Sequence, residues 1–395
     1  MKNCVYCGKE ILTESREHVI QNALGGLYES TSICCGDCNN LISTIIDKDF
    51  TQIFNGIINN IPDMVKTNNK KSKPMCMGKA ICDGKLYDVG IKDGKVVHCP
   101  QYSQEKRQNI NSNEFKIIGY DFPIDNKSFR NGICKIAFNY AIDTGIDPEL
   151  LLRAVNVKKD DKGKVCDINF RYRMIPFAPL NSIDKYIELD TEMELYHNLI
   201  LFTQGNFLWC YVDLFNTFQY YVLLSDEWNN KPIHNDYLQL LQKLDREIPD
   251  IYIRKPKDIL IYAMFYKVKP TLDVEEFKRN VSEAIRNSSN KIEMHDKIEE
   301  KFSGYLASMY EKLGGNRELM REPFENVALY FDENDRLRTE QFRTSVVTDS
   351  LAMSIASYPL TLGEFLKTNS EYIKEYTFAK FRRLNSFLIA LHDNN

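Results

Sequence analysis

Residues 4–39 read CVYCGKEILTESREHVIQNALGGLYESTSICCGDCN, and this stretch decides the fold of the N-terminal part of the chain. Two Cys-x-x-Cys pairs enclose it, an acid–histidine dipeptide and a Gly-Gly pair lie between them, and an asparagine directly follows the last cysteine. The residues concerned are, in order, Cys4, Cys7, Glu17, His18, Gly25, Gly26, Cys35, Cys38 and Asn39. Cysteine pairs at this spacing are typical of metal sites, so we interpret the stretch as a metal-stabilised module.

The four paired cysteines match the ligand set of a structural zinc ion. Zinc prefers four soft or borderline ligands in a tetrahedron, and two Cys-x-x-Cys pairs supply four thiolates. A module of about fifty residues has little core of its own, so a bound zinc would supply much of its folding free energy. Cys34 is an alternative to Cys35, but it leaves three residues before Cys38, and we interpret it as a small apolar strand residue.

The local pattern of this module predicts the order strand, turn, strand, helix. Residues 17–20 and 30–34 are each typical of a short strand. The glycines at 25–26 mark a point where the backbone reverses or approaches another segment closely. From residue 36 onward apolar side chains recur every three or four positions, which predicts a helix beginning at the second cysteine pair.

With these features in this order, residues 4–50 resemble the HNH, or His-Me finger, endonucleases, and most closely their zinc-stabilised branch. The resemblance implies a ββα-metal fold in which the zinc is purely structural. It also implies that His18 is the general base that activates water for attack on a phosphodiester. Glu17 and Asn39 would hold one Mg²⁺ or Mn²⁺ ion beside the scissile phosphate. Gln21 stands where such motifs often carry proline.

The composition is that of a globular protein without a targeting segment. Of the 395 residues, 43% are hydrophobic and 27% are charged, and no run approaches the roughly 18 apolar residues of a membrane helix. The N-terminus lacks the apolar segment of a signal peptide, so we expect a cytoplasmic protein that does not bind membranes. Disulfides are rarely retained in that compartment, and five of the eleven cysteines fall between residues 4 and 38, which favours a local metal site.

Basic residues are concentrated just after the module. Residues 1–50 hold four basic and seven acidic side chains, a net charge of −3, whereas residues 65–107 hold ten basic and four acidic ones, a net charge of +6. We expect this second stretch to bind the phosphates of DNA, or of RNA. The alternative is a solvated face without a ligand. The four residues expected to contact nucleic acid are Lys66, Lys70, Lys71 and Lys73.

The whole chain is predicted to be an α+β protein with three parts. Residues 1–58 form the finger. Residues 59–265 form a mixed α/β domain with a strand meander around the Asp-Gly turns at 83–84 and 93–94, a helix over 132–145, and aromatic strands over 195–225 that we interpret as core rather than as a base-stacking platform. Residues 266–395 form a mostly helical region. Helices are predicted over residues 235–245, 274–287, 295–313 and 370–392.

Two classes of function fit these observations. The first is a metal-dependent DNA endonuclease whose large remainder, residues 59–395, binds an activating ligand or protein partner, in keeping with a role in bacterial defence against phage or foreign DNA. The second is a zinc-finger protein that binds nucleic acid or a protein partner without cutting, in which His18 is structural. Loss of cleavage on replacement of His18 distinguishes the two.

Overall fold

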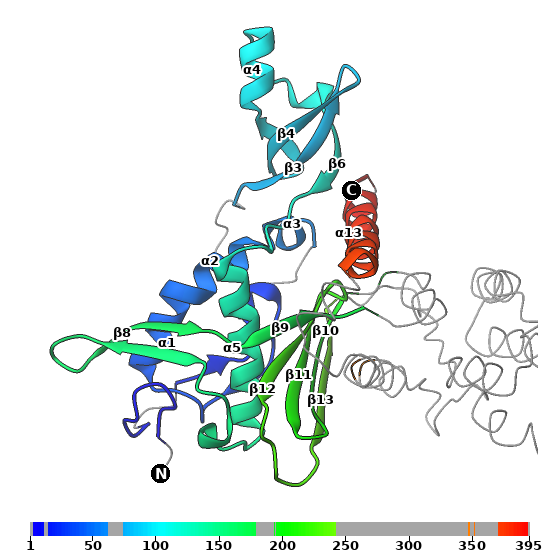
Figure 1. Cartoon of the computed structure of the whole chain (residues 1–395). Helices are drawn as coiled ribbons and strands as arrows, with labels where there is room; N and C mark the ends of the chain where they lie inside the picture. The colour runs from blue at the N-terminus through cyan, green and yellow to red at the C-terminus, as the bar shows by residue number, and fades with distance from the viewer. Residues whose placement is uncertain are drawn as a thin grey trace, which may run out of the picture. The chain divides into compact units, whose positions relative to one another are not determined.

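The computed structural model of the chain describes residues 3–11, 15–61, 74–178, 193, 195–241, 347, 351 and 370–393 (Figure 1). The chain divides into two compact units, the first comprising Met1–Phe177, Met193–Gln242 and Thr377–Asn395, and the second Ala178–Glu192 and Lys243–Tyr376. The elements treated below belong to the first unit, except the N-terminal turns of the last helix. The helices predicted over 274–287 and 295–313 lie outside the described residues.

The N-terminal hairpin follows the order that the sequence predicts, with shorter strands. Strand β1 (Glu17–His18) pairs antiparallel with β2 (Glu29–Ser30), so that His18 lies opposite Glu29. The turn between the two strands requires glycine at two positions. Gly25 has φ +81°, which favours glycine, and a Cβ on Gly26 would lie only 2.2 Å from the carbonyl oxygen of Ile20. Both the reversal and the close approach expected at residues 25–26 are therefore confirmed.

The helical part of the finger begins at the second cysteine pair and is interrupted. Helix α1 (Gly36–Ile42) passes into a π-helical turn over Ser43–Asp47, which is followed by α2 (Lys48–Gln52) and α3 (Asn55–Ile58). The apolar spacing places Ile42, Ile46 and Phe50 in the core. π-helical turns of this kind occur often at functional sites, and this one ends at Asp47.

Residues 76–120 form a four-stranded antiparallel sheet with strand order β5-β4-β3-β6. Asp83, Gly84, Asp93 and Gly94 all have positive φ, as hairpin turns of the Asp-Gly type require. The predicted meander is therefore confirmed. The bounds are β3 (Cys76–Cys82), β4 (Lys85–Lys92), β5 (Lys95–His98), the helix α4 (Pro100–Lys106) and β6 (Lys116–Tyr120).

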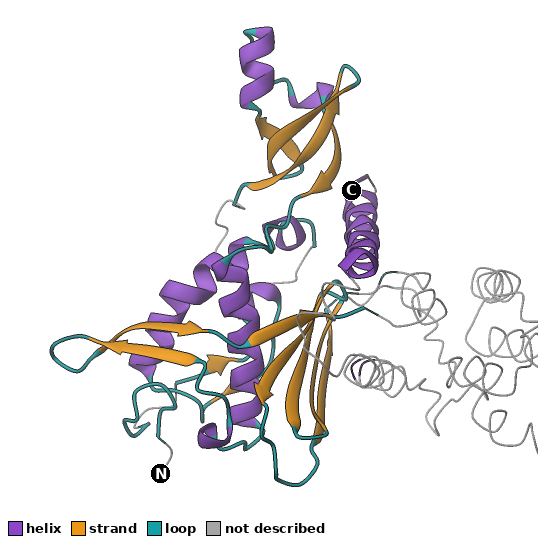
Figure 2. Cartoon of the chain, in the orientation of Figure 1, coloured by secondary structure: helices purple, strands orange, loops and turns teal. Residues whose placement is uncertain are grey.

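Helix α5 (Lys127–Asp143) is the central element of this unit. It packs on the finger helices and on a second, five-stranded antiparallel sheet with the order β13-β10-β11-β12-β9 (Figures 1 and 2). The aromatic strands are buried, as predicted. The remaining bounds are β7 (Val155–Lys159), β8 (Val165–Phe170), β9 (Arg173–Pro176), β10 (Tyr196–Gln204), β11 (Phe207–Leu214), β12 (Phe218–Ser225), β13 (His234–Leu240) and α13 (Ser370–Asp393). Among the helices described, none is long and apolar enough to cross a membrane.

The helix predicted over residues 235–245 is wrong for residues 235–240, and residues 242–245 lie outside the described residues. His234–Leu240 is strand β13, which pairs antiparallel with β10 along its whole length. The spacing of the leucines in this segment suits a helix, but the free edge of β10 supplies a row of backbone hydrogen-bonding groups that only a strand can satisfy. Tertiary context therefore overrides the local pattern.

Two side chains of the five-stranded sheet hold the Gly-Gly turn of the finger. The buried His197 on β10 lies with Nε2 2.9 Å from the carbonyl oxygen of Leu24. Gln239 on β13 donates to the carbonyl oxygen of Gly25 at 2.7 Å and accepts from the backbone N–H of Leu27 at 3.0 Å. The loop between β1 and β2 is thus fixed by residues about two hundred positions away in the chain rather than by the finger alone.

We expect this anchoring to weaken in mild acid. Burial lowers the pKa of His197 to about 4, whereas an unfolded histidine titrates near its usual value. Between those values the unfolded chain takes up a proton that the folded chain excludes, so the free energy of unfolding falls as the pH falls, by about 2 kcal/mol between pH 7 and 5. His197→Gln keeps a donor for Leu24 but does not titrate. Chemical denaturation of the wild type and of His197→Gln at several pH values measures this loss of stability. If the free energies of unfolding of the two proteins fall in parallel with pH, His197 does not cause the loss.

Candidate functional site

The four predicted zinc ligands lie together. The Sγ atoms of Cys4, Cys7, Cys35 and Cys38 are all within 4.8 Å of one another, and those of Cys7 and Cys35 are 3.7 Å apart. Four thiolates around one zinc ion at a Zn–S distance of about 2.3 Å would have sulfur–sulfur distances of about 3.8 Å. The donor set and its spacing therefore fit a structural zinc ion.

Cys34 lies outside this cluster. Its thiol is buried and points at the carboxylate of Glu17, with Sγ 4.0 Å from Oε2. Burial raises the pKa of this thiol, so it is protonated at neutral pH. The choice of Cys35 over Cys34 as the metal-ligand candidate agrees with the geometry.

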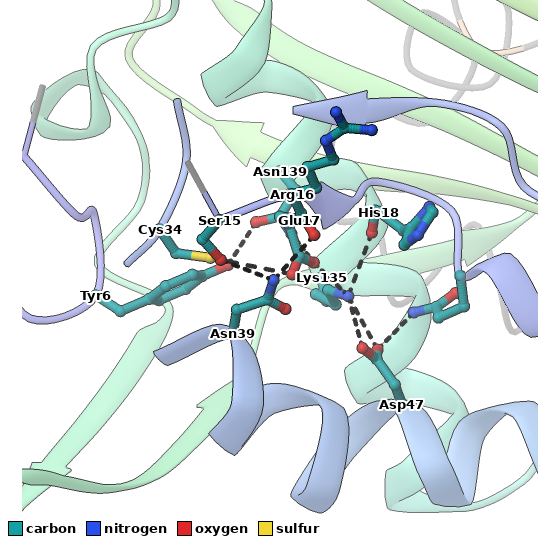
Figure 3. A network of polar contacts seen from close by, with 11 residues as sticks. Tyr6, Ser15, Arg16, Glu17, His18, Cys34, Asn39, Asp47, Lys135 and Asn139 are labelled. Atoms are coloured by element: carbon teal, nitrogen blue, oxygen red, sulfur yellow. Dashed lines mark hydrogen bonds and ion pairs between the residues drawn. The ribbon is translucent and has the colours of Figure 1, made fainter. Parts of the chain in front are cut away.

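Glu17 is buried and already has a cationic partner. Its side chain is 1% exposed, and its Oε1 lies 2.5 Å from Nζ of Lys135, a residue of α5 (Figure 3). Asn139, one helical turn further along α5, donates its Nδ2 to the same oxygen at 3.0 Å. Tyr6 in turn donates its hydroxyl to Oδ1 of Asn139, which joins the first cysteine pair to this network.

Lys135 also contacts two other parts of the finger. Its Nζ lies 2.9 and 3.0 Å from the carboxylate oxygens of Asp47 and 3.5 Å from the main-chain oxygen of His18 (Figure 3). Burial alone would lower the pKa of Lys135, but the charges of Glu17 and Asp47 outweigh it and raise that pKa. Burial raises the pKa of Glu17, the charge of Lys135 opposes this shift only in part, and the charge of Asp47 adds to it.

Asn39 lies at the start of α1, close to the backbone that precedes Glu17. Its Nδ2 donates to Oγ of Ser15 and to the carbonyl oxygen of Arg16, each at 3.0 Å. Among the described residues, Oδ1 of Asn39 has no hydrogen-bond partner and could bind another group. A divalent ion between Glu17 and Asn39 would have two hard oxygen donors, but it would share the carboxylate with the ammonium of Lys135.

The imidazole of His18 points away from the buried network (Figure 3). Its side chain is 31% exposed, and its Nε2 faces Oε1 of Glu29 on β2 at 3.5 Å. Its Nδ1 has no hydrogen-bond partner among the described residues. Glu29 also receives a contact of 3.4 Å from Arg16. One ring nitrogen is therefore beside a carboxylate at the surface and neither is held in a tight hydrogen bond within the described part of the chain.

Sequence reasoning missed Lys135, Asn139, Asp47 and Glu29. One signal was present: Lys135 and Asn139 are four residues apart in a stretch of α5, residues 132–142, that is otherwise largely apolar, which puts both polar groups on one face. Nothing in the sequence indicates that this face meets Glu17, 118 positions earlier. Gln21, which stands where related motifs often carry proline, donates its Nε2 to Asp47 at 2.7 Å and so belongs to the same network.

The basic stretch is described only in part. Lys66, Lys70, Lys71 and Lys73 lie outside the described residues. In the described part, three lysines of the four-stranded sheet and α4 are ion-paired with acids: Lys79 with Asp88, Lys85 with Glu105, and Lys106 with Asp83. Lys92 and Lys95, on either side of the second Asp-Gly turn, form no ion pair among the described residues.

Comparison with known proteins identifies the N-terminal part alone. Residues 4–55 match a family whose description is HNH endonuclease. No curated protein and no solved structure matches the chain. The matched segment contains the cysteine cluster, Glu17, His18, Asn39 and Asp47, whereas Lys135 and Asn139 lie outside it.

Proposed function

Because residues 4–55 form an HNH endonuclease domain, we propose that the protein is a metal-dependent nuclease that hydrolyses phosphodiester bonds of DNA. The match to this family carries the proposal. The cluster of four cysteines and the partly exposed histidine on the β1–β2 hairpin support it, because the first could hold the structural zinc of such a domain and the second could serve as its base.

In this proposal His18 is the general base. A neutral imidazole accepts a proton from water near neutral pH, and the ring of His18 is partly open to solvent at the edge of the hairpin. Because Nδ1 is buried, Nε2 is the proposed proton acceptor, and the carboxylate of Glu29, 3.5 Å from it across the hairpin, would stabilise the imidazolium that forms. The buried contacts of the His18 carbonyl with Lys135 and of the Gly-Gly turn with Gln239 keep the hairpin in place.

Glu17 and Asn39 are the proposed holders of a Mg²⁺ or Mn²⁺ ion. Such an ion stabilises the negative charge that develops on the phosphate and on the leaving oxygen. Carboxylate and amide oxygens are suitable donors, and Asn39 keeps its Oδ1 available by donating its amide N–H groups to Ser15 and Arg16. The four cysteines hold the structural zinc.

A second candidate function is a zinc-finger protein that binds DNA or a partner without cutting it. The observation that favours it is the buried ion pair of Glu17 with Lys135, which satisfies this carboxylate without any divalent ion. The resemblance alone carries the further expectations of a role in defence against foreign DNA and of an activating ligand or protein partner that binds residues 59–395.

Nicking of supercoiled plasmid distinguishes the two functions. The full chain, loaded with zinc, should convert supercoiled plasmid to open-circle DNA with Mg²⁺ or Mn²⁺ and should lose this activity when the divalent ion is left out. Single-stranded DNA and RNA are tested in parallel. Retardation of DNA in a gel without cleavage of any of these substrates under either metal would favour the binding protein.

The described lysines allow a test of the nucleic-acid face. Lys92→Ala with Lys95→Ala removes two charges that no described acid neutralises, so we expect weaker DNA binding and a salt dependence of log K less steep by about 2. Lys79→Ala with Lys85→Ala is the matched control, because both residues are ion-paired with acids. Fluorescence anisotropy at several salt concentrations measures both. Equal effects of the two double variants would show that DNA binding depends on the overall positive charge and not on the two lysines beside the second Asp-Gly turn.

A further inference from the structure

We propose that Lys135 competes with the divalent cation for the carboxylate of Glu17, so that helix α5 sets the cation affinity of the endonuclease domain. This inference rests on the proposed role of Glu17 as a cation ligand. It assigns a function to a residue outside the segment that matches the family.

The ammonium of Lys135 lies among oxygens of the kind that bind a cation. Three groups of the matched segment direct oxygens at it: the carboxylate of Glu17 at 2.5 Å, both carboxylate oxygens of Asp47 at 2.9 and 3.0 Å, and the main-chain oxygen of His18 at 3.5 Å. In Figure 3 the lysine lies between Glu17 and Asp47, beside the strand that carries His18. A positive charge is thus already present on the acid next to the proposed general base.

The charges of this network make the two cations compete for Glu17. Two carboxylates and one ammonium leave a single net negative charge, and the side chains of Lys135 and Glu17 are each only 1% exposed. A divalent ion on Glu17 would lie within a few ångströms of the ammonium, in surroundings where water screens the repulsion poorly. Occupation of Glu17 by the ion is therefore weakened as long as Lys135 stays in place.

Lys135 is held firmly in this position. It lies within the helix that packs on both the finger helices and the five-stranded sheet, and its neighbour Asn139 fixes the same carboxylate oxygen. Removing one partner of a buried ion pair is costly, so Lys135 leaves Glu17 only at a cost in free energy. A high cation affinity would follow only from a displacement of α5 relative to β1, and this makes Lys135 a positioning residue that acts on Glu17.

The test compares cation binding by the wild-type protein and by variants of Lys135. Mn²⁺ is titrated into the zinc-loaded full chain, and its binding is followed by calorimetry and by the shift in melting temperature. Lys135→Met removes the charge from a side chain of similar length, and we expect its half-saturating Mn²⁺ concentration to be lower on the order of tenfold or more, because the repulsion from the ammonium is gone. Lys135→Arg keeps the charge and should bind Mn²⁺ as the wild type does.

Two further variants keep the result interpretable. Lys135→Met leaves two carboxylates unpaired in the core, so the protein carrying Lys135→Met and Asp47→Asn, which restores the net charge of the network, is measured as well. Adding Glu17→Gln to either variant should abolish the gain in Mn²⁺ affinity, because the gain depends on this carboxylate. Failure of Glu17→Gln to do so would place the ion elsewhere and overturn the proposal.

The outcomes separate this inference from the proposed function. If both folded Lys135→Met proteins bind Mn²⁺ no more tightly than the wild type, the competition is wrong, even if the wild type nicks plasmid. If the Lys135→Met proteins gain affinity through Glu17 but no variant cleaves DNA, the competition is supported and the nuclease function fails. If the Lys135→Met proteins have lower half-saturating Mn²⁺ concentrations than the wild type in both the binding and the nicking assays, the competition and the nuclease function are both supported.

Discussion

Replacing His18 with alanine should abolish plasmid nicking while the protein keeps its fold and its zinc. General-base catalysis by a positioned histidine contributes about 10²–10⁴-fold in rate, so the variant should nick at least about a hundredfold more slowly at saturating Mg²⁺ or Mn²⁺. Folding should not suffer, because the ring of His18 is partly exposed and its nearest polar contact, with Glu29, is 3.5 Å long. The measurements are the initial nicking rate, the zinc content and the thermal melting curve.

Two comparisons make this result specific. His98→Ala removes an exposed histidine of β5 and should nick at the wild-type rate. Glu29→Gln keeps the size of the residue opposite His18 but removes the charge, so a loss smaller than that of His18→Ala is expected if Glu29 orients the ring. If His18→Ala nicks as fast as the wild type, the base lies elsewhere, or the cleavage comes from a contaminating nuclease.

The features that sequence alone predicted correctly are local ones. Cys4, Cys7, Cys35 and Cys38 cluster as expected, because Cys-x-x-Cys spacing itself determines how two thiols point at one ion. The Asp-Gly turns likewise specify hairpins through backbone conformations that few other residue pairs adopt. In each case the physical cause lies within a few residues of the pattern.

The features that sequence alone could not reveal depend on contacts between distant segments. The ion pair of Glu17 with Lys135 and the hydrogen bonds of Gln239 to the Gly-Gly turn arise only when α5 and β13 pack on the finger. The same applies to β13 itself, where the edge of β10 imposes a strand on a segment with helical spacing. The finger was expected to end at residue 58, and its polar core is in fact completed by residues 135 and 139.

This sharing of the polar core explains how a domain of about fifty residues can keep a buried and charged site. Each strand of the β1–β2 hairpin pairs over two residues, too few to be stable alone. The cysteine cluster holds one end of the hairpin module, and α5 with the five-stranded sheet holds the other. The two supports are different in kind, because one depends on a metal ion and the other on packing.

Removing the zinc should therefore unfold one end of the finger and leave the sheet in place. We expect Cys38→Ser to lose the single zinc ion, because serine is a poor ligand and the site is left with three thiolates. Zinc sites of this kind supply apparent binding free energies on the order of 10–16 kcal/mol, so the melting of the finger should become a separate, earlier transition. Elemental analysis measures the zinc, and hydrogen exchange of residues 4–39 locates the loss of structure.

Cys34→Ser is the matched control, since Cys34 is buried next to the cluster but is not one of the four sulfurs. It should keep one zinc per chain, whereas retention of zinc by Cys38→Ser would show that the cluster is not the zinc site.

The roles of the zinc and of the divalent ion can then be distinguished in one experiment. Brief treatment with a weak chelator should stop nicking by removing the divalent ion, and Mg²⁺ alone should restore it. After Cys38→Ser, Mg²⁺ should restore nothing, because the hairpin that positions His18 no longer has its zinc support.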